Sequence, residues 1–440
     1  MKKWISLSLS GGKSSRFKSS EHKALHEISG KSVANIIIAT LKKAGINNNA
    51  IVVPKALAKK FSDNLDKEIM IVIQKHAHGT GDAIKVSRKI IKNYKYSLII
   101  NGDLPLVSTN LIKKIIKNHE QNNSVITLTA VSGNKYSGYG KIIVKNSIIE
   151  KIEENVTYSD NDKLNAGIYA VDNAWLLDNI NKIKRASNKE IPLTSIIEIA
   201  RKNNQDVTLL NLGNTDEALQ INTDKQLELV SRKIQNNINT KLINKGVSIQ
   251  NPDNTYIEYD VVIRAGTTIL PNTFIEKASI IGKDCTIGPG AVINSSQVGN
   301  NVHIIDSRIV HSTLKNNVKV GPYSHVRPKS LIMDDVTIGT NVEVKNSIIG
   351  KHSKIGHFSY IGDSELKQSV NIGAGTVTAN YSGTKKHNTY IGANAFIGSN
   401  ATLVAPISIG QNAYVGAGSV INKNIPNGQI WVGNPGKLLK

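Results

Sequence analysis

Short apolar segments and longer amphipathic segments alternate over roughly the first 220 residues of the chain. The apolar segments are rich in β-branched residues, as buried strands are, and the segments between them have helical spacing. This alternation predicts an α/β domain with an open, mainly parallel sheet, whose ligands bind at the carboxyl ends of the strands. The expected strands are 4–9, 50–54, 69–73, 97–101 and 125–131, and the expected helices are 34–44, 56–65, 81–93 and 109–122.

After Gly246 the apolar pattern changes to a repeat of six residues, and glycine commonly follows the aliphatic residue, as in Ile338-Gly339. One short strand and one corner fit each repeat, three repeats make a triangular coil, and stacked coils bury a continuous aliphatic column. The pattern resembles the left-handed parallel β-helix of hexapeptide acyltransferases. The three long runs are Ile263, Ile269, Ile275, Ile281, Ile287 and Ile293; Val320, Val326, Ile332, Ile338 and Val344; and Ile391, Ile397, Leu403, Ile409, Val415 and Ile421.

A single helical pattern without glycine joins the two halves, from Thr223 to about Lys245. It ends before Gly246, as helices often end before a glycine. We therefore expect three parts: an α/β domain over 1–224, a linker helix over 225–246 and a repeat domain over 247–440.

Composition narrows the class of protein. The 440 residues carry a net charge of +22, which first suggests a nucleic-acid partner. The lysines are scattered, however, without the interleaved aromatic residues of a base-stacking surface, so the pattern argues against nucleic acid and leaves phosphorylated ligands open. Cys285 is the single cysteine, which excludes an intrachain disulfide and a cysteine-based zinc site and fits a reduced, cytoplasmic protein. The chain contains no apolar stretch of about 18 residues, so the sequence predicts no membrane span.

A glycine-containing turn, Ser10-Gly11-Gly12-Lys13-Ser14-Ser15-Arg16, follows the first expected strand. Its backbone N–H groups and its two cations could bind a phosphate. A P-loop would need glycine at the position of Leu7, and a dinucleotide-binding G-x-G-x-x-G is absent. A nucleotidyltransferase loop and a plain strand-to-helix turn are the remaining interpretations of this segment.

Further polar residues stand after later strands or between the elements. Asp103, in Asn101-Gly102-Asp103-Leu104-Pro105, is at a strand's carboxyl end and suits Mg²⁺, which takes one or two carboxylates together with phosphate oxygens. The other motifs are His22-Lys23, Gln74 to Ala83 with Gly79-Thr80, Gly138-Tyr139-Gly140, Glu154, Asn165-Ala166-Gly167 and Ile221-Asn222.

The order and spacing of these motifs resemble, over nearly the whole chain, the bacterial bifunctional N-acetylglucosamine-1-phosphate uridyltransferase / glucosamine-1-phosphate N-acetyltransferase family. The resemblance implies a Rossmann-like nucleotidyltransferase domain in which the sugar 1-phosphate attacks the α-phosphorus of UTP and releases pyrophosphate. Such a reaction needs positioning and charge neutralisation rather than a protein nucleophile. By resemblance, Arg16 and Lys23 are catalytic and contact the phosphates, and Gly12 binds the nucleotide substrate. The resemblance also implies that Gln74, Gly79 and Thr80 bind the uracil, that Gly140, Glu154 and Asn165 hold the sugar, and that Asp103 and Asn222 hold Mg²⁺.

The chain departs from the family pattern at a few positions. Ser14 replaces a glycine of the loop, His22 replaces the proline before Lys23, and Ala166 replaces the threonine after Asn165. The end of the chain lacks the family's longer basic tail, for which Lys437 is a candidate substitute in binding coenzyme A.

Polar residues also interrupt the six-residue repeats where packing does not require them. Each one alone could simply be an outward-facing side chain, but together they match the family's acetyltransferase motifs. The resemblance implies that His357 is the general base that deprotonates the amine of glucosamine 1-phosphate as it attacks acetyl-CoA, a role suited to a neutral imidazole. It implies further that Arg327, Lys345 and Lys386 bind the sugar phosphate, that Tyr360 and Asn371 orient the sugar, and that Asn380, Tyr381, Ser399 and Ala417 contact acetyl-CoA.

The resemblance also implies a homotrimer with acetyltransferase sites between neighbouring subunits, and no membrane partner. Two alternatives stay open at this point. One activity alone could be retained, with acetyl transfer favoured by the departures in the glycine loop. The chain could also be a basic scaffold that binds nucleotide sugars or nucleic acid.

Overall fold

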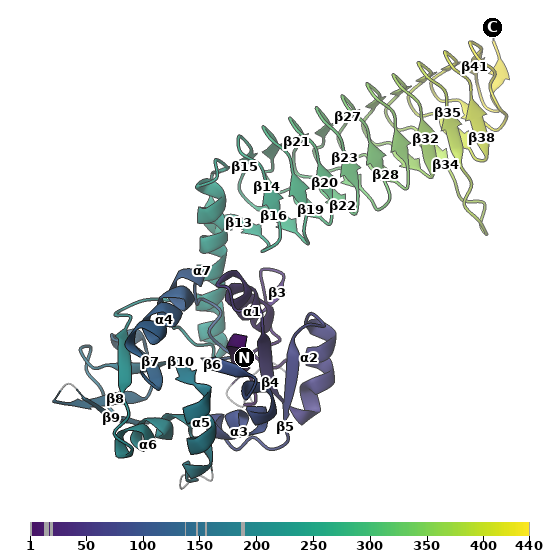
Figure 1. Ribbon diagram of the computed structural model, residues 1–440. Helices are drawn as coiled ribbons and strands as arrows, with labels where there is room; N and C mark the ends of the chain where they lie inside the picture. The colour runs from purple at the N-terminus through teal and green to yellow at the C-terminus, as the bar shows by residue number, and fades with distance from the viewer. Residues whose placement is uncertain are drawn as a thin grey trace. The chain divides into compact units, whose positions relative to one another are not determined.

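The computed structural model describes residues 2–12, 17, 21–136, 138–146, 148–154, 156–185 and 190–439. The chain forms two compact units, Met1–Ile234 and Gln235–Lys440 (Figure 1). No helix among the described residues is long and apolar enough to cross a membrane.

A mixed sheet forms the centre of the first unit, with strand order β11-β7-β10-β6-β1-β4-β5. β1 pairs in parallel with β4 and β6, whereas β10 lies antiparallel between β6 and β7. The expected strands correspond to β1, β4, β5, β6 and β7. The strands of this unit are β1 Lys2–Leu9, β2 Glu27–Ile28, β3 Lys31–Ser32, β4 Asn49–Pro54, β5 Met70–Gln74, β6 Tyr94–Asn101, β7 Ile126–Val131, β8 Lys141–Lys145, β9 Ile148–Glu153, β10 Leu164–Asp172 and β11 Val207–Asn211.

Two of the longer helices of this unit begin at a serine whose side chain caps them. The Ser32 hydroxyl accepts a hydrogen bond from Asn35 N, and the Ser108 hydroxyl accepts one from Leu111 N, which satisfies amides that a helix start leaves free. The α-helices are α1 Val33–Lys43, α2 Ala58–Asn64, α3 Thr80–Ile91, α4 Thr109–Asn122, α5 Asn173–Asn179 and α6 Ile196–Lys202, and the 3₁₀ turns are η1 Lys55–Leu57, η2 Asn134–Tyr136, η3 Ile180–Lys182 and η4 Leu193–Ser195.

A buried histidine fixes helix α4 against the sheet. His119 is 1% exposed and packs edge-on against Trp4 and Tyr96, and its Nδ1 lies 2.9 Å from the Thr127 hydroxyl. Its Nε2 is buried and has no hydrogen-bond partner among the described residues. Burial therefore lowers the pKa of His119 to about 4, since the charged imidazolium would lose its hydration there.

This histidine makes the stability of the first unit depend on pH. In the unfolded chain the imidazole binds a proton below about pH 6.5, whereas the folded chain resists protonation down to about pH 4, so stability falls as the pH is lowered through this window. The loss should reach about 2 kcal/mol between pH 7.5 and 5. Urea unfolding of wild type and His119→Phe at both pH values checks this. Equal pH dependence in the two proteins would contradict it.

Helix α7, Asp224–Ile243, leads into the second unit. From Gln235 onward it is tied to the first coils of the repeat domain. The buried Asn239 amide donates to Pro252 O at 2.9 Å and Thr255 O at 3.3 Å, and Gln235 Nε2 donates to Ile257 O. A 3₁₀ turn, η5 Pro252–Asn254, follows β12.

Three sheets of stacked short strands form the rest of the second unit, one sheet on each side of a triangular coil (Figure 1). Among the described residues the sheets have 12, 10 and 9 strands, and they are parallel except where β42 turns back on β41. The prediction of an α/β domain followed by a parallel β-helix of hexapeptide repeats is thereby confirmed.

The strands of these sheets are two to four residues long. Sheet C contains β12 Ser248–Ile249, β15 Thr268–Ile269, β18 Thr286–Ile287, β21 His303–Ile304, β24 Lys319–Val320, β27 Thr337–Ile338, β30 Lys354–Ile355, β33 Asn371–Ile372, β36 Phe396–Ile397, β39 Tyr414–Val415, β41 Ile430–Val432 and β42 Lys437–Leu438. Sheet D contains β13 Thr255–Ile257, β16 Thr273–Glu276, β19 Val292–Asn294, β22 Arg308–Val310, β25 His325–Val326, β28 Glu343–Lys345, β31 Tyr360–Gly362, β34 Val377–Ala379, β37 Thr402–Val404 and β40 Val420–Ile421. Sheet E contains β14 Val262–Ile263, β17 Ile280–Ile281, β20 Gln297–Val298, β23 Thr313–Leu314, β26 Leu331–Ile332, β29 Ile348–Ile349, β32 Ser364–Leu366, β35 Thr389–Ile391 and β38 Ile407–Ile409.

The aliphatic residues of the repeat form the core of the β-helix. Ile269, Ile287 and Ile304, on successive coils of sheet C, are all fully buried. Many corners contain Asn or Asp in the left-handed region, such as Asn301 and Asn317, where these residues are better tolerated than other L-residues. The side chains of these two asparagines also bond to each other at 2.9 Å, so the corners stack as the strands do.

Candidate active sites

The carboxyl ends of β1, β4 and β5 lie at the same edge of the sheet, and the glycine turn after β1 reaches Gln74 at the end of β5. A Cβ on Gly11 would lie 1.9 Å from Gln74 Oε1, so only glycine allows this approach. Gln74 is buried, and its Nε2 donates to Gly79 O at 3.1 Å and to Asp82 Oδ2 at 2.8 Å. Gly79 directly precedes α3, has φ +94° and lies close to Ile191 O. This backbone conformation and this narrow space exclude a side chain.

Thr80, predicted to bind the uracil, has its hydroxyl engaged within the protein. Its Oγ1 accepts a hydrogen bond of 2.9 Å from Leu193 N and so fixes α3 to η4. The Gly79-Thr80 segment is therefore held from both sides, by Gln74 and by the turn that contains Leu193.

Lys23, Asp103 and Asn222 meet at the carboxyl end of β6. Lys23 Nζ lies 2.5 Å from Asp103 Oδ2 and 2.9 Å from Asn222 Oδ1, so its ammonium bridges the two residues predicted to hold Mg²⁺. Asp103 is 6% exposed, and its Oδ1 has no hydrogen-bond partner among the described residues. A buried carboxylate oxygen without a donor is costly, and a cation ligated there would remove that cost.

His22, which stands where the family pattern has proline, connects the glycine turn to Lys23. Its ring is buried against Phe61; Nε2 lies 3.0 Å from Gly12 O, and Nδ1 accepts a hydrogen bond from Ala24 N at 3.2 Å. These bonds require the neutral ring with its proton on Nε2. Burial lowers the pKa of His22, which favours that neutral form.

The residues predicted to hold the sugar also lie together. Asn165 N donates to Gly140 O at 2.8 Å, and Asn165 Oδ1 accepts from Gly167 N at 3.0 Å. A Cβ on Gly140 would lie 3.0 Å from Glu154 Oε1. The predicted phosphate contact Arg16 and its neighbours Lys13 and Ser14 lie outside the described residues.

In the β-helix, five of the predicted residues gather around sheet D and the loop after β34. The side chains of Lys345 and Lys386 are close neighbours, and the contact between these two cations lowers the pKa of Lys386. Asn380 Nδ2 lies 3.4 Å from the Tyr360 hydroxyl, and Tyr381 forms an antiparallel bridge with Lys386. Two neighbouring ammonium groups favour an anion between them.

Arg327 lies on the same sheet but is already paired. Its Nη1 is 2.6 Å from Glu343 Oε1, which raises the pKa of Arg327. Glu343 is directly opposite Tyr360 in the register of β28 and β31.

The other predicted acetyltransferase residues lie along the corner of the β-helix between sheet C and sheet D. We call this row of residues the corner line. His357, Ser399 and Ala417 each follow the glycine after a sheet C strand, so they lie at the same corner of the coils that contain β30, β36 and β39. Asn371 begins β33, which lies between β30 and β36. A Cβ on Gly398 would lie 2.4 Å from Ala417 N, which shows how closely these corners stack. In the described part of the chain, no hydrogen bond or ion pair joins this line to the Lys345–Lys386 group.

Three supporting residues were not predicted. Gln226 Oε1 accepts from Asn222 N at 2.8 Å, Asp363 accepts from the side-chain amides of Asn346 and Asn380 at 2.5 Å each, and Thr340 N donates to His357 Nδ1 at 2.9 Å. Asp363 lies three residues after the predicted Tyr360, but its buried position, which marks it as a supporting residue, is not visible in the sequence. No sequence pattern indicates that Gln226 contacts Asn222 or that Thr340 contacts His357, because both contacts form only in the folded chain.

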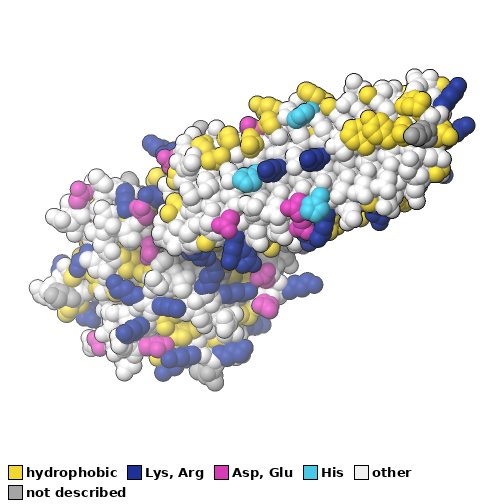
Figure 2. Space-filling view, turned by 90° about the horizontal axis from the view of Figure 1, so that it is seen from above, with side chains coloured by type: hydrophobic (Ala, Val, Ile, Leu, Met, Phe, Trp, Pro, Cys, Tyr) yellow, Lys and Arg dark blue, Asp and Glu magenta, His cyan; other side chains and the backbone are white. Residues whose placement is uncertain are grey.

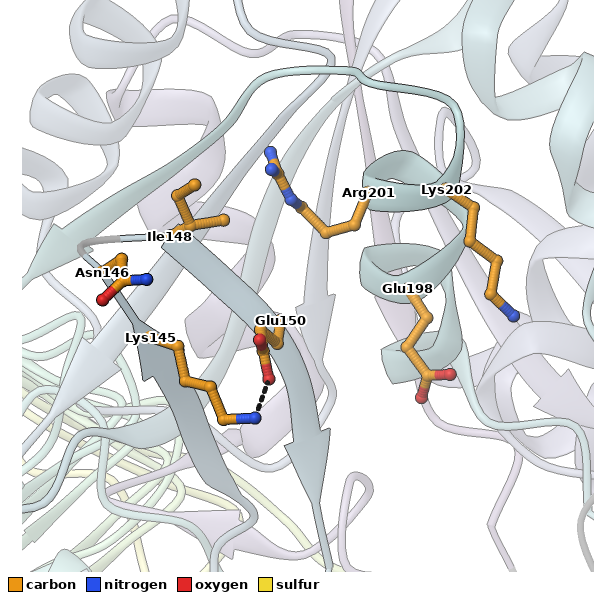
Figure 3. Close-up of a pocket in the computed structure, with 7 residues that line it drawn as sticks. All are labelled: Lys145, Asn146, Ile148, Glu150, Glu198, Arg201 and Lys202. Atoms are coloured by element: carbon orange, nitrogen blue, oxygen red, sulfur yellow. Dashed lines mark ion pairs between the residues drawn. The ribbon is translucent and has the colours of Figure 1, made fainter.

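A separate cavity of about 400 Å³ lies between β8, β9 and α6 (Figure 3). Its cations do not converge: Lys145 is paired with Glu150 at 3.2 Å, and Arg201 and Lys202 point to different sides. None of its lining residues belongs to the predicted sites, and the arrangement shows no ligand-binding geometry.

Comparison with known proteins finds similarity in both units. Residues 7–166 match the MobA-like NTP transferase domain, 290–372 the GlmU-like C-terminal hexapeptide, and 260–295 and 388–423 the bacterial transferase hexapeptide. The bifunctional protein GlmU of Caldanaerobacter subterraneus subsp. tengcongensis is 35% identical over 98% of this chain and 95% of its own length. The bifunctional protein GlmU of Fervidobacterium nodosum is 36% identical over 99% of this chain and 95% of its own length. The chain therefore belongs to the GlmU family of bifunctional proteins.

Proposed function

We propose that this protein is a bifunctional enzyme of UDP-N-acetylglucosamine synthesis. It transfers acetyl from acetyl-CoA to glucosamine 1-phosphate, and then transfers uridylyl from UTP to N-acetylglucosamine 1-phosphate with release of pyrophosphate. The observation that carries this proposal is the similarity to bifunctional relatives over 98% of the chain, with a polar cluster in each unit.

In uridylyl transfer, the chain's own residues position charge around the phosphates. Lys23 neutralises phosphate oxygens, Gln74 and the Gly79-Thr80 segment hold the uracil, and Gly140, Glu154 and Asn165 hold the sugar. Gly12 and Arg16 complete the phosphate contacts. The Lys23 ammonium bridges Asp103 Oδ2 and Asn222 Oδ1. If another cation binds these two oxygens, the ammonium can move toward the phosphates.

Asp103 and Asn222 are the residues that would hold Mg²⁺. Asp103 Oδ1, which has no partner among the described residues, and the hard oxygen donors of both side chains fit this ion, which would complete its coordination with phosphate oxygens and water. When bound, Mg²⁺ neutralises charge on the triphosphate.

In acetyl transfer, Lys345 and Lys386, with Arg327, bind the sugar phosphate, and Tyr360 and Asn371 orient the ring. Asn380, Tyr381, Ser399 and Ala417 contact acetyl-CoA. His357 accepts the amine proton as nitrogen attacks the thioester carbon. A neutral imidazole has one lone pair, and Nδ1 uses it for the Thr340 amide, so His357 has to release that amide to take up the proton.

The hexapeptide repeats support a homotrimer, in which neighbouring subunits complete each acetyltransferase site. We place the enzyme in the cytoplasm. The three parts proposed for the chain are a nucleotidyltransferase domain over 1–224, a linker helix over 225–246 and an acetyltransferase domain over 247–440. The helix that the structure has in the linker region is α7, Asp224–Ile243.

Separate assays of the two half-reactions test this function. We expect UTP-dependent pyrophosphate release with N-acetylglucosamine 1-phosphate and acetyl-CoA-dependent thiol release with glucosamine 1-phosphate. A metal chelator should abolish the first and leave the second unchanged, because only the uridylyl site relies on Mg²⁺. Restoration by added Mg²⁺ is the control. Absence of both activities together with salt-sensitive RNA binding would instead favour the scaffold.

A further inference from the structure

The outward residues of sheet C change character near the C-terminal end of the β-helix. Because the strands are in register, one outward residue per coil forms a continuous ladder along this sheet. The first eight members are polar or charged, and the next two are aromatic. In order, the ladder reads Ser248, Thr268, Thr286, His303, Lys319, Thr337, Lys354, Asn371, Phe396, Tyr414 and Ile430.

The two aromatic rings form a stacked pair on the surface. The centroids of Phe396 and Tyr414 are 4.8 Å apart with an interplanar angle of 4°, and the side chains are 38% and 43% exposed. Exposing two aromatic rings on one polar sheet face is costly unless a ligand or partner covers them. Figure 2 shows hydrophobic side chains gathered toward this end of the β-helix, with basic side chains at its tip.

The pair lies on the two coils that carry Ser399 and Ala417. Phe396 precedes Ser399 by three residues, and Tyr414 precedes Ala417 by three. A glycine, Gly398 or Gly416, lies between each aromatic residue and its corner residue. No side chain therefore projects at that position between the ring and the corner. The other neighbour of Phe396 in the ladder is Asn371.

Cations bracket the pair along the same sheet. Lys354 stands two strands before Phe396, and Lys437 lies on β42, two strands beyond Tyr414; both side chains are exposed. Flat aromatic surface flanked by ammonium groups suits a nucleotide, whose base stacks and whose phosphates need positive charge. A purely apolar protein partner would not require the cations.

We propose that Phe396 and Tyr414 form an adenine-binding platform for the nucleotide end of acetyl-CoA, with Lys354 and Lys437 facing its phosphates. This inference rests on the proposed acetyl transfer. The thioester end would reach the corner line of His357, Ser399 and Ala417, while the adenine stacks on the exposed rings. The platform would supply binding rather than chemistry, so it should affect the KM for acetyl-CoA and leave kcat unchanged.

A donor that lacks the base gives a direct test. Wild type and the double variant Phe396→Leu/Tyr414→Leu are assayed with acetyl-CoA and with S-acetyl-4′-phosphopantetheine, which has no adenosine. We expect the double variant to raise the KM for acetyl-CoA about tenfold or more, as loss of base stacking does elsewhere. The KM for the truncated donor and for glucosamine 1-phosphate should stay as in wild type.

Phe274→Leu is the matched control, since Phe274 is 44% exposed on the same β-helix and its ring meets Tyr256 at 6.1 Å. It should leave both donors unaffected. An unchanged KM for acetyl-CoA in the double variant, or an equal rise for both donors, would overturn the platform. A fall in molecular mass by light scattering, with lost activity for both donors, would also overturn it and assign the pair to a subunit contact.

The test separates failure of the platform from failure of the proposed function. If wild type does not acetylate glucosamine 1-phosphate, the proposed acetyl transfer fails. Calorimetric titration with coenzyme A then still tests the platform: binding by wild type that weakens tenfold in the double variant supports it, and binding equal in both proteins, or absent in both, refutes it.

Discussion

Replacing Asp103 with asparagine should reduce uridylyl transfer by roughly 10²- to 10³-fold, the range found when one preorganised electrostatic contact is removed from a reaction centre. Asp103→Asn keeps the shape of the side chain but removes the charge from a carboxylate that lies 2.5 Å from Lys23 Nζ. The buried Oδ1 of this carboxylate has no hydrogen-bond partner in the part of the chain that the structure describes. Steady-state pyrophosphate release over a range of Mg²⁺ concentrations measures the effect. We expect the variant to need more Mg²⁺ for half-maximal rate.

The second activity of the same chain provides the control for this variant. Acetyl transfer by Asp103→Asn should equal that of wild type, because Asp103 lies in the first unit and the Lys345–Lys386 group in the second. Asp63→Asn, at an exposed position of α2, is the matched substitution and should leave uridylyl transfer intact. Wild-type uridylyl transfer by Asp103→Asn would remove this residue from the metal site.

Removal of the imidazole in His357→Ala should lower the kcat of acetyl transfer by roughly 10²- to 10⁴-fold, the usual contribution of a general base. The KM for acetyl-CoA should change little, since the ring acts on the amine proton. Loss of the ring also leaves Thr340 N without its acceptor, but that amide is exposed, so water can replace the bond at small cost. Thiol release at saturating substrates measures the effect.

His352→Ala serves as the control, because His352 is another exposed histidine of the β-helix and lies 3.5 Å from Asp335 rather than on the corner line. It should acetylate at the wild-type rate. Uridylyl transfer should be unaltered in both histidine variants. An acetyl-transfer rate in His357→Ala equal to that of wild type would assign the base role to another group.

The fold was largely predictable because both halves have strong periodicity. The six-residue spacing places every repeat's aliphatic residue inward, and residues such as Ile287 and Ile397 are fully buried as expected. In the first unit, the five expected strands match strands of the sheet, but the place of β10, Leu164–Asp172, did not follow from the pattern. Its antiparallel position between β6 and β7 depends on pairing between residues far apart in the chain, which local periodicity does not encode.

The candidate sites were predictable in residue type rather than in contact. Asp103 at a strand end suggested a magnesium ligand, but nothing in the sequence placed Lys23 between it and Asn222, which is 199 residues away from Lys23. The same holds for Thr340 and His357, which are neighbours because consecutive coils stack. The Phe396–Tyr414 stack likewise joins two coils.

The sequence by itself determined an α/β domain, a helix and a β-helix, since alternating and six-residue apolar patterns admit few ways of burying their aliphatic faces. It also identified, by resemblance, the residues that carry the chemistry. The tertiary structure alone decided which residues meet: Lys23 with Asp103 and Asn222, Lys345 with Lys386, and His357 with Thr340. The physical reason is that burial is specified locally by side-chain polarity, whereas proximity depends on strand order and coil stacking.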